Sequence, residues 1–131
     1  MQTIFPILRY ADARAAISWL RAAFGFVEVF SVPESGPAVR HAQLRLDSNI
    51  IMLGSVRDED GIASPKDLGT TTQALYVQVD DLDAHFEQAR RAGAQIDSPP
   101  ADTDFGFREY CARDLEGHLW VFGTYLPEAD P

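Results

Sequence analysis

The chain has 131 residues and a globular composition, with 46% hydrophobic and 24% charged residues. A chain of this length forms one domain that buries enough surface to fold without a disulfide or a structural metal. Acidic residues outnumber basic ones 20 to 11, and the net charge of −9 argues against binding to nucleic acid or to an anionic membrane surface.

The first half of the chain predicts a strand, a helix and three further strands. Pro6 removes one backbone donor, which favours an edge position for the first strand. Asp12 is a good helix N-cap, the apolar residues after it recur at helical spacing, and Gly25 ends the helix. The predicted ranges are a strand over 4–10, a helix over 13–24, and strands over 26–32, 39–46 and 50–53.

The second half predicts the same order after a polar stretch over 56–72, which has no periodicity and indicates a linker or a mobile flap. Asp81 caps a second helix, and Gly93 ends it. The prolines within 98–100 are expected to break the strand that follows. The predicted strands cover 75–79, 94–97, 107–113 and 119–125.

The two halves are related by a constant offset. Asp81 lies 69 residues after Asp12, and Phe122 lies 69 residues after Leu53. An equal spacing across helix, strands and hairpin indicates two copies of one βαβββ unit, which we place at 4–56 and 73–125 of a single domain over 1–131.

A sheet of four strands with one helix leaves one face bare, and the second copy is the obvious cover for it. We therefore predict an α+β fold in which two tandem βαβββ modules form a half-barrel around a cavity. Cavities of this kind bind small ligands.

Two segments resemble a known family. The helix and its end at 12–26 resemble the first helix of the vicinal oxygen chelate superfamily, which includes glyoxalase I, bleomycin-resistance proteins, extradiol dioxygenases and fosfomycin-resistance enzymes. The segment from Arg113 to Trp120 is similar to the closing hairpin of that family, with Leu115 where proline is common. The resemblance covers nearly the whole chain and implies the two-module fold and a homodimer. It leaves the function open, because the superfamily includes isomerases, dioxygenases, transferases and pure binders.

The resemblance also implies where a metal would bind. Family members hold a divalent ion with His and Glu on the first and last strands of each module. The corresponding positions here are Phe5, Met52, Ala74 and Val121. These side chains offer no hard nitrogen or oxygen donor, so we expect no metal and no cofactor.

Alternation along the strands predicts which residues face the cavity, while the face of the third strand in each module stays open. On each strand, residues an even number of positions from the aligned ligand position should line the cavity. Trp120, on the opposite face, should pack under the helices. The candidate ligand-binding residues are Phe5, Ile7, His41, Met52, Tyr76, Gln78, Arg108, Tyr110 and Val121.

Other residues that carry chemistry receive structural interpretations. We expect His85 on a solvated helix face, and His118 as a hydrogen-bonding residue of the closing turn. Cys111, the one cysteine, allows no intrachain disulfide and is expected to act as a small buried hydrophobe. No catalytic residue is assigned.

These observations favour a metal-free protein that binds an antibiotic or an aromatic metabolite over an enzyme. The alternatives are a glyoxalase-like lyase or isomerase or a dioxygenase-type enzyme, metal-dependent or acting through Tyr76, His41 and Arg108, and an interaction domain with a vestigial cavity. The N-terminus has no signal peptide and no stretch approaches the roughly 20 apolar residues of a membrane span, so a cytoplasmic location is expected.

Overall fold

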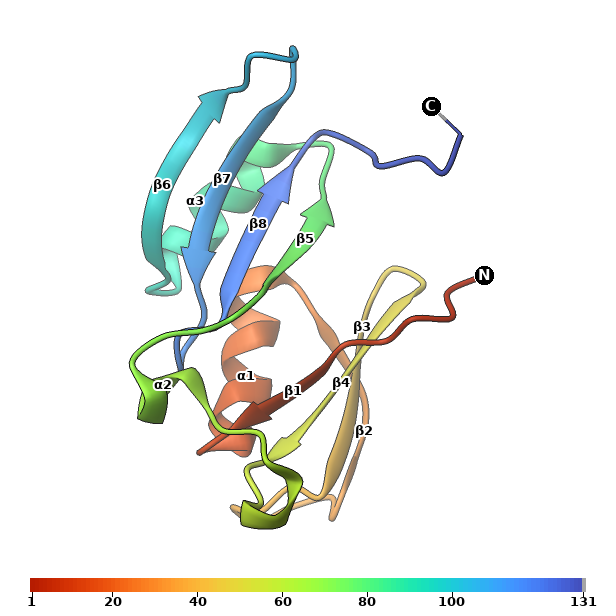
Figure 1. The fold of residues 1–131 in the computed structure, drawn as a ribbon, viewed down its shortest axis with the longest axis vertical. Helices are drawn as coiled ribbons and strands as arrows, with labels where there is room; N and C mark the ends of the chain where they lie inside the picture. Colours follow the sequence, from red (N-terminus) through yellow and green to blue (C-terminus); the bar gives the residue numbers. More distant parts are fainter. Residues whose placement is uncertain (131) are drawn as a thin grey trace.

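The structure, a computed structural model that describes residues 1–130, contains two four-stranded sheets with the same topology (Figure 1). In each sheet the first strand of the module pairs in parallel with the last, and the other neighbours are antiparallel. The first module contains β1 (Ile7–Tyr10), α1 (Ala13–Phe24), β2 (Val27–Val32), β3 (His41–Leu46) and β4 (Asn49–Ser55), in the sheet order β1-β4-β3-β2. The second contains β5 (Ala74–Gln78), α3 (Leu82–Arg91), β6 (Gln95–Asp102), β7 (Arg108–Arg113) and β8 (Leu119–Gly123), in the order β5-β8-β7-β6. The α+β architecture of two βαβββ modules is confirmed.

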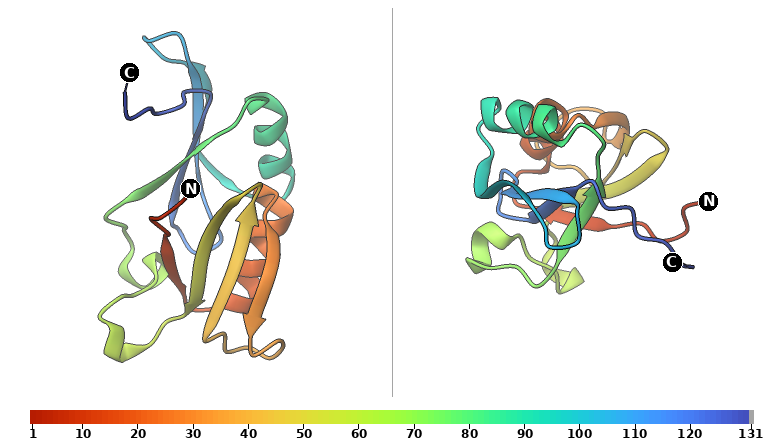
Figure 2. Two further views of the ribbon diagram at one scale, coloured as in Figure 1. Left: turned by 90° about the vertical axis from the view of Figure 1, so that its right-hand side faces the viewer. Right: turned by 90° about the horizontal axis from the view of Figure 1, so that it is seen from above.

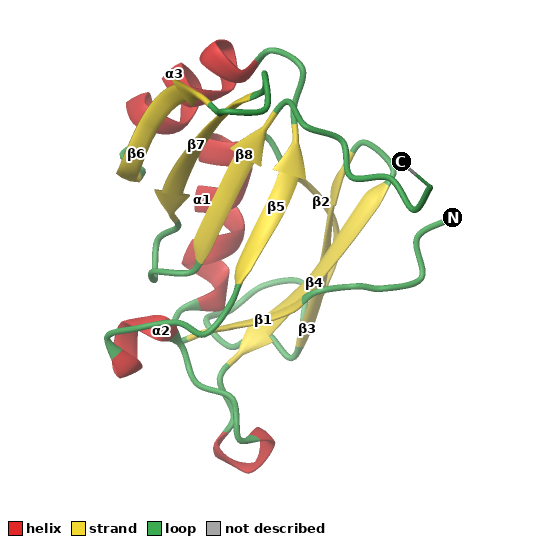
Figure 3. Ribbon diagram, turned by 45° about the horizontal axis from the view of Figure 1, so that its top comes forward, coloured by secondary structure: helices red, strands yellow, loops and turns green. Residues whose placement is uncertain are grey.

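The two long helices lie together on one side of the molecule, and both sheets turn their other face away from them (Figures 2 and 3). The helix-facing side of each sheet carries the buried residues, such as Leu8 and Leu53 in the first sheet and Trp120 and Phe122 in the second. We call the other side of each sheet its open face. No helix among residues 1–130 is long and apolar enough to cross a membrane.

Matching caps begin the two helices. The Asp12 carboxylate accepts a hydrogen bond from the amide of Ala15 at 3.1 Å, and Asp81 accepts one from Ala84 at 3.2 Å. Each bond satisfies one of the backbone donors that a helix start leaves unpaired. Gly25 ends α1 in a left-handed conformation with φ of 80°, which glycine adopts without steric cost.

One apolar core joins the two modules. Phe24, at the end of α1, packs against Trp120 and Phe122 of β8, with ring centroids 5.3 Å and 4.8 Å apart. The first helix therefore covers part of the second sheet as well as its own, and the modules share buried surface instead of folding as separate units.

The closing turn of the second module is bonded to the start of the first. Asp114 accepts hydrogen bonds from the Tyr10 hydroxyl at 2.6 Å and from the Trp120 indole at 3.0 Å. Glu116 accepts bonds from the amides of Ala11 and Asp12, just before α1.

Two further contacts complete this junction. The Ser64 hydroxyl donates to Glu116 at 2.6 Å, and a ring nitrogen of His118 donates to the Arg9 carbonyl at 3.1 Å. The expected hydrogen-bonding role of His118 is confirmed. The turn that carries the family resemblance is therefore a structural junction between the modules.

Two expectations about elements are wrong. β1 begins at Ile7, later than the expected start at Ile4. The polar stretch 56–72 connects the modules as expected, and it contains a short 3-10 turn (Asp58–Asp60) and a helix, α2 (Pro65–Leu68). The second wrong expectation is the break in β6. β6 continues through its two prolines, because it is the edge strand of its sheet and its register shifts between Ser98 and Ala101.

The repeat offset also changes by one residue along one strand pair. Leu53 pairs with Ala42, whereas its equivalent Phe122 pairs with Tyr110, only 68 positions after Ala42. The extra residue of the first module lies at Arg40, before β3. A longer turn between β7 and β8 restores the offset of 69 afterwards. A one-residue shift exchanges the two faces of a strand, so His41 corresponds to Glu109 and not to Tyr110.

Candidate functional site

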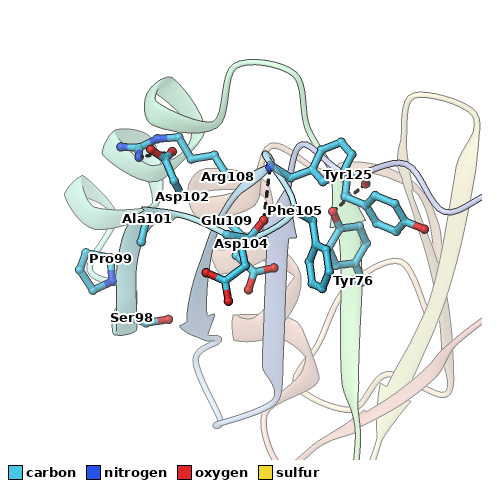
Figure 4. Close-up of a pocket in the computed structure, with 12 residues that line it drawn as sticks. Tyr76, Ser98, Pro99, Ala101, Asp102, Asp104, Phe105, Arg108, Glu109 and Tyr125 are labelled. Atoms are coloured by element: carbon cyan, nitrogen blue, oxygen red, sulfur yellow. Dashed lines mark hydrogen bonds and ion pairs between the residues drawn. The ribbon is translucent and has the colours of Figure 1, made fainter.

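A cavity of about 870 Å³ lies against the second module (Figure 4). Its floor comes from the open face of the second sheet, and its walls come from β6, the β6–β7 loop and the segment after β8. The lining residues are Tyr76, Ser98, Pro99, Ala101, Asp102, Thr103, Asp104, Phe105, Phe107, Arg108, Glu109 and Tyr125. None comes from the first module, so this cavity belongs to the second module alone.

The β6–β7 loop is a compact turn held by its own hydrogen bonds. The Thr103 amide donates to the Phe107 carbonyl at 2.7 Å, and the Phe107 amide donates to the Thr103 hydroxyl at 3.2 Å. Gly106 takes a φ of 83° inside the turn. This turn presents the ring of Phe105, which is 86% exposed, at the rim of the cavity.

Tyr76 forms the inner corner of the cavity. Its ring lies over Gly123 of the neighbouring strand, where a side chain would come within 2.5 Å of the phenol oxygen. Its hydroxyl donates a 2.6 Å hydrogen bond to the Tyr125 carbonyl. Partial burial, followed by the nearby charge of Glu109, raises the pKa of Tyr76, so this phenol stays neutral at physiological pH.

The segment after β8 is held in place as a wall by that bond and by aromatic packing. The rings of Phe107 and Tyr125 meet edge to face with centroids 4.9 Å apart. The cavity therefore has four aromatic residues, from three separate segments of the chain, within its lining.

Acidic groups dominate the charge of the lining, with Asp102, Asp104 and Glu109 against the single basic residue Arg108. The guanidinium of Arg108 contacts Asp83 of α3 and Asp102, each at 3.2 Å. These two ion pairs direct it toward α3 at the edge of the cavity.

The candidate residues of the first module lie on the open face of the first sheet and outside this cavity. Ile7 pairs with Met52 across the sheet, and Phe5 precedes β1. The ring of His41 lies 5.6 Å from that of Phe30. These residues share one exposed surface.

The remaining candidates from the second module divide between the two faces. Gln78 and Val121 lie on the open face beside Tyr76, although neither lines the cavity. Tyr110 is fully buried on the helix-facing side, so its expected place in the cavity wall is corrected. The one-residue shift along β3 and β7 is the reason.

Buried Tyr110 and half-buried His85 form a hydrogen-bonded pair instead. The Tyr110 hydroxyl and Nδ1 of His85 are hydrogen-bonded, and the His85 ring lies 4.2 Å from that of Phe122. Burial lowers the pKa of His85 and raises that of Tyr110. The expectation of a solvated His85 is therefore wrong, since this histidine packs between α3 and the sheet.

A model of the Glyoxalase/Bleomycin resistance protein/Dioxygenase superfamily matches residues 3–122. The chain belongs to this superfamily.

A relative and two solved structures cover most of the chain. The uncharacterized protein Mb0911c of Mycobacterium bovis is 34% identical over 128 residues, which cover 95% of this chain and 84% of that relative. The crystal structure of TioX from Micromonospora sp. ML1 has a TM-score of 0.77 at 34% identity and covers 97% of this chain and 98% of its own. The fosfomycin resistance protein FosX from Mesorhizobium loti has a TM-score of 0.68 at 13% identity, covering 95% and 92%, a likeness that concerns the fold alone.

The positions that the superfamily resemblance assigns to metal ligands do not fit a divalent ion in this member. Phe5, Ala74 and Val121 have no donor atoms, and Met52 has only a soft thioether. Within residues 1–130, no three His, Cys, Asp or Glu side chains gather as a metal site requires. The cavity described above offers aromatic rings, hydrogen-bonding groups and the carboxylates of Asp104 and Glu109.

Strand alternation missed several residues of the cavity lining. Phe105, Phe107 and Tyr125 lie in loops or at strand ends, where alternation gives no information. Asp104 lies in the same turn, and Glu109 shares the open face of β7, which the sequence left undecided. The signal that could have found them is the run of exposed aromatic and acidic residues around Gly106, typical of a binding loop.

Proposed function

We propose that this protein binds a small aromatic molecule, of the antibiotic or aromatic-metabolite class, in the cavity of the second module and without a metal ion. The observation that carries the proposal is the aromatic lining, in which a large cavity is bordered by Tyr76, Phe105, Phe107 and Tyr125. Exposed aromatic side chains around a concave surface favour stacking with a flat ligand.

The superfamily supports this function without specifying the ligand. Its name includes bleomycin resistance proteins. Binding, rather than catalysis, fits the side chains present, because the four aligned ligand positions lack hard donors. Arg108, a candidate in the catalytic alternative, is already paired with Asp83 and Asp102.

We also propose that the protein acts as a homodimer. Phe5, Ile7, Phe30 and Val32 are all exposed on or beside the open face of the first sheet. A contiguous apolar surface of this kind favours a partner.

A thermal-shift screen of aromatic antibiotics in the presence of a metal chelator tests the proposed binding. A ligand that binds only the folded protein stabilises it by RT ln(1 + [L]/Kd) and so raises its melting temperature. Tyr76→Ala and Phe105→Ala should abolish most of the shift, because each removes one aromatic wall.

Leu68→Ala is the matched control, since Leu68 is an exposed apolar residue of α2 that does not line the cavity. This variant should keep the full shift. A shift that appears only after divalent metal is restored, or that survives both aromatic substitutions, would contradict the proposal.

A further inference from the structure

We propose that the cavity selects cationic aromatic ligands, meaning flat apolar compounds that carry an ammonium or quaternary ammonium group. This inference rests on the function proposed above and adds the charge of the ligand to it. It depends on the uncompensated carboxylates of the lining and on the exposed aromatic rings beside them.

Two carboxylates are available to a ligand. Asp104 and Glu109 both line the cavity and both are exposed, and neither forms an ion pair with any residue of the described chain, 1–130. Figure 4 shows both side chains projecting into the space between Ser98 and Tyr76. Glu109 pairs with Gly123 across the sheet, and the Tyr76 ring lies over Gly123, so Glu109 borders the aromatic corner of the cavity.

The one cation of the lining does not oppose this field. All three guanidinium nitrogens of Arg108 are engaged, with Nε and one terminal nitrogen on Asp83 and the other terminal nitrogen on Asp102. A carboxylate ligand would have to displace one of these pairs before it could use the planar fork of the arginine. Arg108 therefore neutralises Asp102, and the cavity keeps the charge of the other two acids.

The aromatic residues add a second attraction of the same sign. A cation over the face of a phenyl or phenol ring is attracted by the ring quadrupole, whereas an anion is repelled. The ring of Phe105 is almost fully exposed at the rim. A ligand that stacks on the walls thus brings its charged group close to Asp104 or Glu109.

The local groups decide the preference, although the net charge of −9 acts in the same direction. Charges more than about 8 Å away are largely screened at physiological ionic strength. Carboxylates and rings that border the cavity act within that distance.

The test is calorimetric titration of the full chain with three probes that share one ring system. These are a naphthylmethyl-trimethylammonium salt, naphthylmethanol and naphthylacetate, which carry a positive charge, no charge and a negative charge. We expect the cation to bind most tightly and the anion most weakly, with about a tenfold difference between these two, as two partly exposed charge pairs would give.

Two variants and a matched control assign the preference to the cavity. Glu109→Gln and Asp104→Asn should each weaken the cationic probe about threefold and weaken naphthylmethanol by a clearly smaller factor. Glu34→Gln removes the same charge from the exposed turn after β2 and should change neither affinity.

The outcomes separate the two proposals. If all three probes bind equally, or if Glu34→Gln weakens the cation as much as Glu109→Gln does, the charge inference is wrong and the aromatic binding function stands. If none of the probes binds, both proposals are wrong for this cavity. Circular dichroism of each variant verifies that the fold is retained.

Discussion

Asp114 is a single side chain on which the contact between the two modules depends. Its carboxylate accepts bonds from the Tyr10 hydroxyl and the Trp120 indole, and also from the backbone amides of Glu116 and His118. Asp114 is itself buried. Burial and this carboxylate together raise the pKa of Tyr10 well above its ordinary value.

We expect Asp114→Ala to lower the free energy of unfolding by about 3 kcal/mol or more, because buried donors would be left without an acceptor. Urea denaturation measures the change. Asp104→Ala removes an exposed carboxylate and should cost less than about 0.5 kcal/mol. Equal losses in the two variants would show that the Asp114 bonds contribute little.

His85 predicts an acid-dependent loss of stability. Burial lowers its pKa below the ordinary 6.5, so the folded state disfavours the charged ring. Well above pH 6.5 the ring is neutral in both states and contributes no pH dependence. As the pH falls below that value, the unfolded chain binds a proton that the folded chain resists, and stability falls by up to about 1.4 kcal/mol per pH unit.

The comparison of wild type with His85→Gln isolates this effect, because glutamine has no titrating ring and can still hydrogen-bond to Tyr110. Unfolding free energies measured in a series of buffers from about pH 8 to about pH 5 should fall less steeply in the variant than in the wild type. Parallel curves for the two proteins would mean that His85 is not the group responsible.

At the scale of the elements, Gly54 and Gly123 lie at equivalent places in the two sheets. At each of them another part of the chain lies too close to leave room for a side chain. A side chain at Gly123 would come within 2.5 Å of the Tyr76 phenol oxygen, and one at Gly54 would come within 2.8 Å of the Arg40 carbonyl. The first obstacle is the end of a side chain that can move. The second is backbone.

We therefore expect Gly54→Ala to destabilise the protein by about 1–3 kcal/mol through overpacking, and Gly123→Ala by less. Gly123→Ala should instead displace the Tyr76 ring, break its bond to Tyr125 and weaken ligand binding. Thermal unfolding and ligand titration of both variants measure the two effects. A larger loss of stability in Gly123→Ala would contradict this assignment.

The same elements show what the sequence could predict. Caps such as Asp12 and Asp81 act within a few residues, so both helices follow from local pattern. The side chains on the open face of β5 could also be predicted. Tyr76 lies two positions after the aligned residue Ala74, so both point to the same face of the strand. The face of β7 could not, since the extra residue at Arg40 changes the register through a pairing that only the folded sheet reveals.

Local pattern also says little about the cavity. Its aromatic residues Phe105, Phe107 and Tyr125 come together through a turn and through a bond from the Tyr76 hydroxyl to a distant carbonyl. Neither has a periodic signature. The edge position of β6, which allows its prolines, follows from strand order, and strand order is a property of the whole sheet.

At the scale of the whole molecule, the open face of the first sheet is the feature that a single chain leaves unexplained. Ile7 and Phe30 are exposed there, beside Met52 and His41. We expect a homodimer whose formation covers this surface, and light scattering should give twice the mass of the chain.

Ile7→Glu should shift that equilibrium toward the monomer, because it places a charge in the covered surface. Lys66→Glu, in α2, changes charge elsewhere and should leave the dimer intact. A wild-type protein that is monomeric at every concentration would contradict the prediction.

The measurement that tests the central claim most directly is a nuclear magnetic resonance titration of the isotope-labelled protein with the naphthylmethyl-trimethylammonium probe, in a buffer that contains a metal chelator. The account predicts that the amide signals that move most belong to Tyr76, to the β6–β7 turn around Phe105 and to Tyr125, with binding complete without added metal. Signals that move elsewhere, or that move only when a divalent metal is supplied, would contradict it.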